Sequence, residues 1–234
     1  MKRRTGCIWL LLILFSSSVF GQTDTLDAKR FSHYLEDQLF FNLSYIAIRH
    51  LHPDLTQQGF SHSVSFGFIR DIPVNLRRNL GFGLGVGYER DIFYQNLRIS
   101  VSESDGSIQY TILDPGSYLN NAFVIKKIVF PVEFRYRNSD ATRFRFFRIY
   151  AGTLIGYTVG AESHYETDKV SVDYRKLTSI PNRWQWGVYL YAGYGELNGY
   201  IYYGLNDLFS PQVKFNGTHV PMYDLKFGVM LSFL

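Results

Sequence analysis

The sequence predicts an all-β protein, an eight-stranded antiparallel transmembrane β-barrel of the outer-membrane type. Four observations predict it. The chain begins with a secretory leader, and bulky apolar residues then alternate with small or polar ones in eight successive stretches. After the leader, no apolar run approaches the roughly 18 residues expected of a transmembrane helix. Aromatic residues make up 18% of the chain, a composition that favours strands.

Residues 1–21 form the predicted signal peptide. A positively charged start at residues 2–4 (KRR) precedes an apolar run at residues 7–15 (CIWLLLILF). Residues 19–21 (VFG) then put small or moderate side chains at the −3 and −1 positions of a cleavage site. The apolar run is too short for a membrane anchor, which needs about 20 residues. Residues 22–38 are polar, and we interpret them as a periplasmic segment ahead of a barrel at residues 39–234.

Removal of the leader changes the charge of the chain. The leader holds three of the 24 Lys and Arg residues, which leaves 21 basic against 20 acidic residues and a net charge of +1. A nearly neutral mature chain gives no reason to expect a nucleic-acid partner. The only cysteine, Cys7, lies within the leader, so the mature chain has no internal disulfide. Cys7 also lies too early to be the lipidated residue of a lipoprotein.

The clearest strand is the stretch 79–89. One parity carries Leu80, Phe82, Leu84, Val86 and Tyr88, and the other carries Gly81, Gly83, Gly85, Gly87 and Glu89. Successive side chains of a strand point to opposite faces, whereas glycines in a helix would cost about 1 kcal/mol each. A bulky face opposite a bare one suits a barrel in lipid with a crowded interior. The strict period of two, with no helix after it, excludes a phosphate-binding glycine loop.

Seven further stretches complete the set, and all but 197–205, where residues 200–203 (YIYY) are apolar on both faces, show this alternation. In chain order, the predicted strands cover residues 39–48, 60–71, 79–94, 122–137, 144–160, 182–195, 197–205 and 222–233. Long connections alternate with short ones, and the longest lie at 97–121 and 161–181. Outer-membrane barrels have short periplasmic turns and longer extracellular loops, so this order places both termini in the periplasm.

A secreted β-sandwich is the alternative fold, since it also alternates in strands. A sandwich buries its apolar parity in a core and exposes the other parity to water. Here the other parity carries glycine and charges of both signs, which suits a crowded interior. The chain also ends in a strand with phenylalanine at its penultimate position, close to where barrel-assembly signals carry an aromatic residue. Both features favour the barrel.

Strand parity also predicts what lies inside the barrel. Glu89, Glu133, Arg135, Arg137 and Lys226 share the inward parity. An eight-stranded barrel is just wide enough for its own side chains, so we expect a Glu/Arg network that plugs the lumen. A proton or ion path is the alternative role for these charges. Aromatic residues near the strand ends would form interfacial belts: Tyr88, Phe93, Tyr94, Tyr136, Trp184, Trp186 and Tyr194.

Residues of catalytic or metal-binding type occur only as sequence neighbours. His50 and His52 form an H-x-H pair without an identifiable third metal ligand. Two groups supply the residue types of a lipid hydrolase at the barrel rim: His62 with Ser61 or Ser63, and His164 with Ser163 and Glu162. Because catalytic groups would have to converge from different strands, we predict no catalytic, metal-binding or cofactor-binding residues, and no enzymatic activity.

The segment Gln57–Tyr88 resembles a corresponding stretch of PorT-type outer-membrane barrels of Bacteroidetes. Residues 132–137, 147–152 and 202–209 resemble them too. The founding member of that family is implicated in type IX protein secretion and gliding motility, and the family has no catalytic motif to carry over. The resemblance therefore implies an accessory or assembly component. Its partners would be outer-membrane lipid and other outer-membrane or periplasmic secretion components. A narrow porin-like or solute-binding barrel and a lipid-modifying barrel enzyme are the alternative functions.

Overall fold

The computed structural model describes residues 37–49, 54–75, 77–102, 104–138, 146–215, 218–219 and 221–233. The predicted signal peptide and residues 22–36 lie outside these residues, as do His50 and His52. Gln38, which we predicted to end the periplasmic segment, is the first residue of the first strand. No helix in the described ranges is long and apolar enough to cross a membrane.

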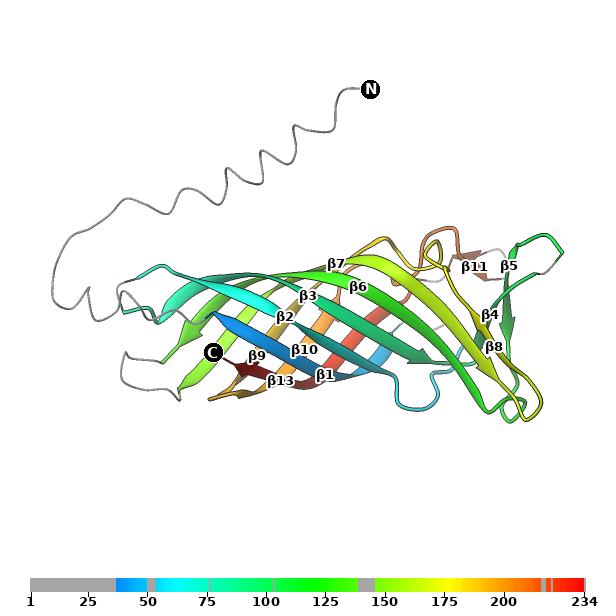
Figure 1. Cartoon of the computed structure of the whole chain (residues 1–234), viewed down its shortest axis with the longest axis horizontal. Coiled ribbons are helices and arrows are strands. Elements are labelled where there is room, and N and C mark those ends of the chain that lie inside the picture. Colours follow the sequence, from blue (N-terminus) through cyan, green and yellow to red (C-terminus); the bar gives the residue numbers. More distant parts are fainter. Residues whose placement is uncertain are drawn as a thin grey trace, which may run out of the picture. The chain divides into compact units, whose positions relative to one another are not determined.

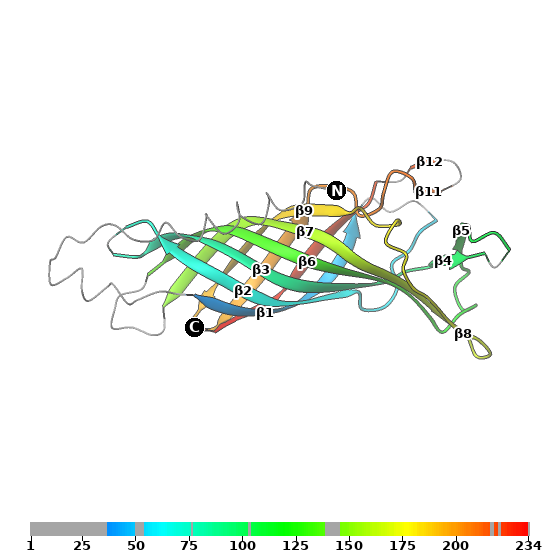
Figure 2. The same cartoon turned by 45° about the horizontal axis from the view of Figure 1, so that its top comes forward.

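Eight long strands close into an antiparallel barrel, as the sequence predicts (Figure 1). Their neighbour order is β6-β3-β2-β1-β13-β10-β9-β7, and pairing of β6 with β7 closes the ring. The two views of Figures 1 and 2 show the strands tilted in the same sense around the barrel. Its strands are β1 (Gln38–Arg49), β2 (His62–Pro73), β3 (Leu80–Tyr94), β6 (Asn120–Arg137), β7 (Phe147–Glu166), β9 (Trp184–Tyr194), β10 (Leu197–Gly204) and β13 (Tyr223–Phe233).

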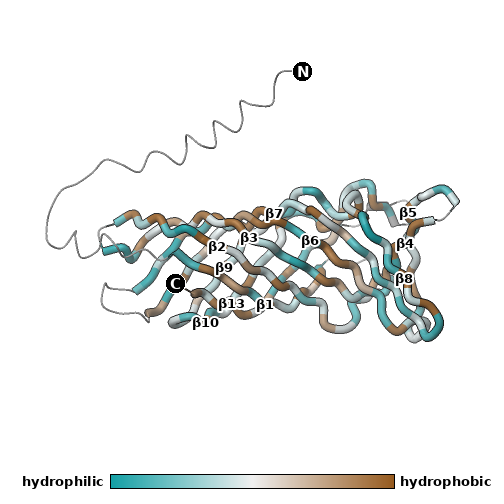
Figure 3. Tube along the Cα trace, in the orientation of Figure 1, coloured by the Kyte–Doolittle hydropathy of each residue, from teal (hydrophilic) through white to brown (hydrophobic). Residues whose placement is uncertain are grey.

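Large apolar side chains cover the outside of this barrel. On β3, Phe82, Leu84 and Val86 are each about half exposed, while Glu89 on the other parity is 2% exposed. The same alternation of apolar and polar residues runs along the other barrel strands in Figure 3. Outward residues of β3 stay apolar or aromatic from Leu80 to Tyr88. The length of this stretch is close to the roughly 9–11 residues that a tilted strand needs to cross a bilayer. The outward face is thus suited to lipid.

Five short strands lie in the predicted loops. They are β4 (Leu97–Val101), β5 (Ile108–Ile112), β8 (Ser171–Tyr174), β11 (Lys214–Phe215) and β12 (Thr218–His219). β4 pairs with β5, β11 pairs with β12, and β8 pairs with the end of β7. β4, β5, β8 and β11 lie together at one end of the barrel, opposite the C-terminal strand end (Figure 1). We call this end of the barrel the loop end, and the opposite end, where short turns join the strands, the turn end.

The predicted loop at 161–181 is wrong over its first part, because β7 continues to Glu166. Asn120 of β6 pairs with Glu166, and Ala122 pairs with His164. Residues 162–166 of β7 (ESHYE) carry polar side chains on both faces, so this part of the strand lacks the apolar alternation that marks the membrane-facing strands. Backbone pairing between two long strands, rather than side-chain pattern, determines its structure.

Apolar side chains close the loop end. Loop residues Leu55, Leu177, Ile180, Leu208 and Phe209 pack in one buried cluster with the inward-facing Ile46, Phe93, Phe123 and Ile125, and we call this cluster the apolar cap. The rings of Phe123 and Phe209 pack edge to face, with their centroids 5.7 Å apart. Phe93 is fully buried, so its assignment to an interfacial belt is wrong: it shares the inward parity of Glu89. The belt residues Tyr136, Trp184, Trp186 and Tyr194 are exposed on the outside.

Candidate functional site: a charged and filled lumen

Two buried ion clusters lie inside the barrel, and the first is near the turn end. Arg137 donates from both Nη atoms to the two carboxylate oxygens of Asp71, at 2.8 Å each. Arg135 donates from Nε to Glu133 at 2.7 Å and from Nη1 to Asp71 at 3.1 Å. All four side chains are fully or almost fully buried. We call Asp71, Glu133, Arg135 and Arg137 the turn-end cluster.

Tyrosines of β9 complete the bonding of Glu133. The Tyr189 hydroxyl donates to Oε2 at 2.7 Å, and the Tyr191 hydroxyl donates to Oε1 at 3.1 Å. Both carboxylate oxygens are therefore engaged. The glycine parity of β3 makes room for this arrangement, because a Cβ on Gly83 would lie 2.7 Å from Arg135 Nε and from Glu133 Cγ. The bare face seen in the sequence is thus filled by charged side chains of the neighbouring strand.

The second cluster lies nearer the loop end. Lys226 Nζ contacts Glu89 at 2.7 Å and Asp91 at 2.9 Å, and lies 3.5 Å from Asp224. Lys127 Nζ contacts the same two carboxylates at 2.6 and 2.7 Å and donates to Gln185 at 3.2 Å. We call Glu89, Asp91, Lys127, Asp224 and Lys226 the loop-side cluster. Two ammonium groups facing three carboxylates allow each lysine to pair with more than one acid.

Sequence reasoning missed four members of these clusters: Asp71, Asp91, Lys127 and Asp224. The signal was present. Asp91 follows Glu89 by two residues, and Asp224 precedes Lys226 by two, so parity places each of them beside a residue that we had assigned to the lumen. Asp71 extends the inward parity of β2 in the same way. The structure also forms two clusters where we predicted one network.

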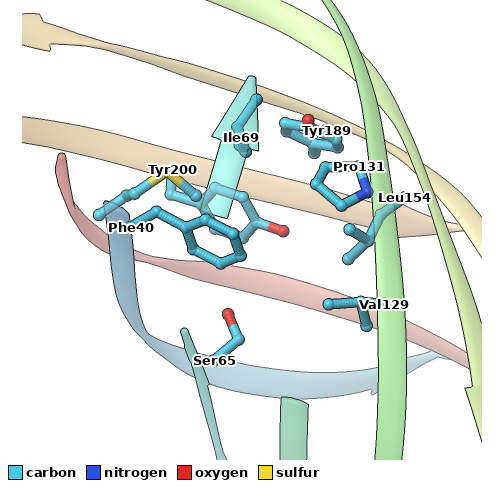
Figure 4. Close-up of a pocket in the computed structure, with 9 residues that line it drawn as sticks. Phe40, Ser65, Ile69, Val129, Pro131, Leu154, Tyr189 and Tyr200 are labelled. Carbon is cyan, nitrogen blue, oxygen red and sulfur yellow. The ribbon is translucent and has the colours of Figure 1, made fainter. Parts of the chain in front are cut away.

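Apolar and tyrosine side chains separate the two clusters. Phe40, Ile69, Tyr189, Tyr200 and Met230 belong to this middle layer. It surrounds a small cavity with room for about one water molecule, seen with its lining side chains in Figure 4. Along β6, inward residues pass from the cap (Phe123, Ile125) through Lys127 and Val129 to Glu133 and Arg135. Side chains thus fill the lumen at four successive levels.

The serine and histidine groups do not assemble into a catalytic arrangement. Ser61 and Ser63 are buried on the inward parity, whereas a His62 ring nitrogen lies 2.9 Å from the Phe60 carbonyl oxygen. His164 Nδ1 lies 2.5 Å from Asp173, while Glu162 pairs with Lys126 at 2.7 Å. Hydrogen bonding to Asp173 raises the pKa of His164 above its usual 6.5. The described part of the chain contains no group of three residues able to hold a metal ion.

Comparison with known proteins identifies the barrel at the level of family. The family model described as an outer membrane protein beta-barrel domain matches residues 20–210, which include every barrel strand except β13. A search of curated proteins found no match.

Proposed function

Because this chain belongs to the outer membrane protein beta-barrel family, we propose that it acts as a non-enzymatic accessory or assembly component with a plugged lumen. The filled interior is the observation that carries this proposal. Two ion clusters, the middle layer and the apolar cap occupy the space through which a solute would have to pass. Opening such a path would separate buried ion pairs, and breaking a buried pair costs about 3–5 kcal/mol.

Type IX secretion is the process that we assign to it. The support is the resemblance of Gln57–Tyr88 and of residues 202–209 to PorT-type barrels. A plugged barrel in a secretion system would act through the surfaces that it offers to other proteins. The β4–β5 hairpin and the end of β7, which pairs with β8, project beyond the lipid-facing band, and we propose these surfaces for partners.

We place the loop end outside the cell and the termini in the periplasm. The turns at the opposite end are short, which is typical of the periplasmic side. The charges support the same direction. Register places Arg90 beside Lys126 on the outward face, next to Tyr88 and Ile128 at the edge of the apolar band. Arg90 is exposed, and such cations suit the phosphate groups of lipopolysaccharide in the outer leaflet.

Conductance across a planar bilayer tests the plug. The purified barrel should insert without producing stable single-channel currents, while a general porin in the same bilayer serves as the positive control. Large, steady conductance would contradict a plugged lumen and favour the narrow porin. Liposome swelling with sugars of increasing size provides a second measurement, and no sugar should enter faster than in empty liposomes.

Gene deletion tests the process. We expect loss of type IX secretion and of gliding, both restored by the wild-type gene. Normal secretion in the deletion strain would refute the type IX assignment and leave the barrel assignment standing. Photo-crosslinkers at Leu119 and Val170, both exposed at the loop end, should capture partner proteins in intact cells. A crosslinker at Val86, on the lipid-facing band, is the matched control and should capture none.

A further inference from the structure

Arg148 is a buried cation without an ionic partner in the described structure. It is the second residue of β7, points into the turn end of the lumen and is 1% exposed. Its Nε and Nη1 atoms have no hydrogen-bond partner among the residues that the structure describes. The rings of Phe146 and Tyr150 lie 4.7 and 6.0 Å from its guanidinium carbon. Contacts with aromatic faces stabilise a cation, but they leave its N–H groups unbonded.

Neighbouring carboxylates are already engaged. Register places Arg148 beside Arg137, whose guanidinium binds Asp71 through both oxygens. Glu133 is occupied by Arg135 and two tyrosines. The turn-end cluster together with Arg148 therefore has three guanidinium groups against two carboxylates. Gln38, whose Oε1 accepts from Arg135, also has an Nε2 donor that is unbonded within the described part of the chain.

This imbalance defines the chemistry of a group that would bind beside Arg148. Buried charges in proteins are normally paired, and an uncompensated one costs several kcal/mol. The unbonded groups around the cluster include two guanidinium N–H donors and an amide donor, and the surplus charge is positive. On its other side, Arg148 has Gly193 as its cross-strand neighbour, and Asn198 of β10 packs over this glycine, with its Oδ1 2.8 Å from where a Cβ would be. A group that accepts hydrogen bonds and carries negative charge would bond these donors and balance the surplus charge.

We propose that Arg148 is the centre of an oxyanion-binding site at the turn end of the lumen, which accepts a single carboxylate or phosphate group. The Arg148 guanidinium offers N–H donors to anionic oxygen atoms, and Arg137 beside it adds positive potential. The flanking rings of Phe146 and Tyr150 exclude water, which strengthens a charged hydrogen bond. This site is independent of the secretion process assigned above, because it requires only the folded barrel.

Thermal unfolding of the purified barrel in detergent micelles tests this site. Inorganic phosphate and sodium acetate are titrated separately at constant ionic strength, with chloride as the balancing anion. The wild-type melting temperature should rise saturably with at least one of them, and the arm with the larger rise identifies phosphate or carboxylate as the preferred group. Arg148→Gln should remove this dependence.

Arg70→Gln is the matched control. Arg70 lies on the outward face near the turn end and already pairs with Asp37 at 2.6 Å, so its loss should leave the anion dependence intact. Absence of any anion-specific rise in the wild type, or an equal rise in Arg148→Gln, would overturn the proposal.

If Arg148→Gln fails to fold, Arg148→Lys takes its place. This variant keeps the charge but loses the multiple donors of the guanidinium, so the anion concentration at half-saturation should rise at least about tenfold. An unchanged half-saturation point would equally refute a guanidinium-centred site.

Discussion

Inward glycines of β3 and β7 create the space that charged residues of β6 occupy. A Cβ on Gly83 would meet Arg135 and Glu133, and one on Gly152 would lie 2.8 Å from Glu133 Cβ. Small residues on one strand and long charged residues on the next are therefore complementary. This complementarity explains why a barrel with a glycine-rich face contains so little free space.

Gly83→Ala should destabilise the barrel by about 1–3 kcal/mol, because the added methyl group overpacks the turn-end cluster. Gly199→Ala is the matched control: it lies on an exposed position of β10, and its nearest neighbouring atom would be 3.9 Å away. Urea unfolding in lipid vesicles measures both variants. Equal stabilities of the two would show that Gly83 is not required for packing.

Lys226→Met should destabilise the protein by about 3–5 kcal/mol, because it leaves Glu89, Asp91 and Asp224 with only Lys127 among the lysines of their cluster. Lys169→Met, at an exposed position of the β7–β8 turn, should change stability by less than about 0.5 kcal/mol. The same unfolding experiment compares them. A loss of under 1 kcal/mol in Lys226→Met, on the order of an ordinary substitution, would mean that the ion cluster contributes little to stability.

At the scale of elements, β7 has two parts: one faces lipid and the other faces water. Its first part carries apolar residues outward and belongs to the membrane-spanning barrel. Its last part, up to Glu166, pairs with β8 and holds polar residues such as His164. One continuous strand thus extends from the lipid-facing barrel into water. There the exposed pair of His164 and Asp173 joins β7 to β8.

His164 should titrate with a midpoint above 6.5, because the hydrogen bond to Asp173 favours its protonated form. A raised pKa in the folded protein means that the pair stabilises the β7–β8 hairpin below pH 6.5, and that this contribution is lost as the pH rises through the folded-state value. Histidine NMR shifts measure the midpoint. Asp173→Asn should lower it more than Glu166→Gln does, since Glu166 lies farther away at 3.6 Å; the reverse order would contradict this assignment.

For the whole molecule, an apolar band encircles the barrel while polar and charged groups lie inside it. This distribution is the reverse of that in a water-soluble sandwich, and it identifies the surrounding solvent as lipid. Above the band, the chain covers its own outward face: Ile92, Ala122 and Val124 are buried there and pack with Tyr94. The lipid boundary at the loop end therefore lies near Arg90 and Lys126.

Leu84→Arg should destabilise the inserted barrel by about 2–4 kcal/mol, because Leu84 lies in the middle of the apolar stretch of β3. Leu119→Arg, at an exposed leucine beyond the band, should be close to neutral. Folding equilibria in phospholipid vesicles provide the comparison. Similar costs at both positions would place the lipid boundary elsewhere.

Strand parity and the order of connections predict the barrel from the sequence. Alternation is a local property, because a strand places every second side chain on the same face whatever its neighbours are. The eight strands, the lipid-facing residues and the inward position of Glu89, Glu133 and Lys226 all follow from it. The same rule applied consistently would have placed Phe93 inside, and Asp91 and Asp224 beside the predicted charges.

Other features depend on contacts between distant parts of the chain. The partition of lumen charges into two clusters depends on which strands are neighbours, since Lys226 meets Glu89 only when β13 and β3 belong to one closed ring. The apolar cap gathers loop residues that have no strand pattern of their own, such as Leu177 and Leu208. The sequence by itself determined a barrel in lipid, because the alternation within each strand distinguishes the residues that face lipid from those that face the lumen. Only the tertiary structure decided how that barrel is filled and which buried charge, Arg148, lacks a partner among the described residues, because pairing requires side chains from separate strands to meet.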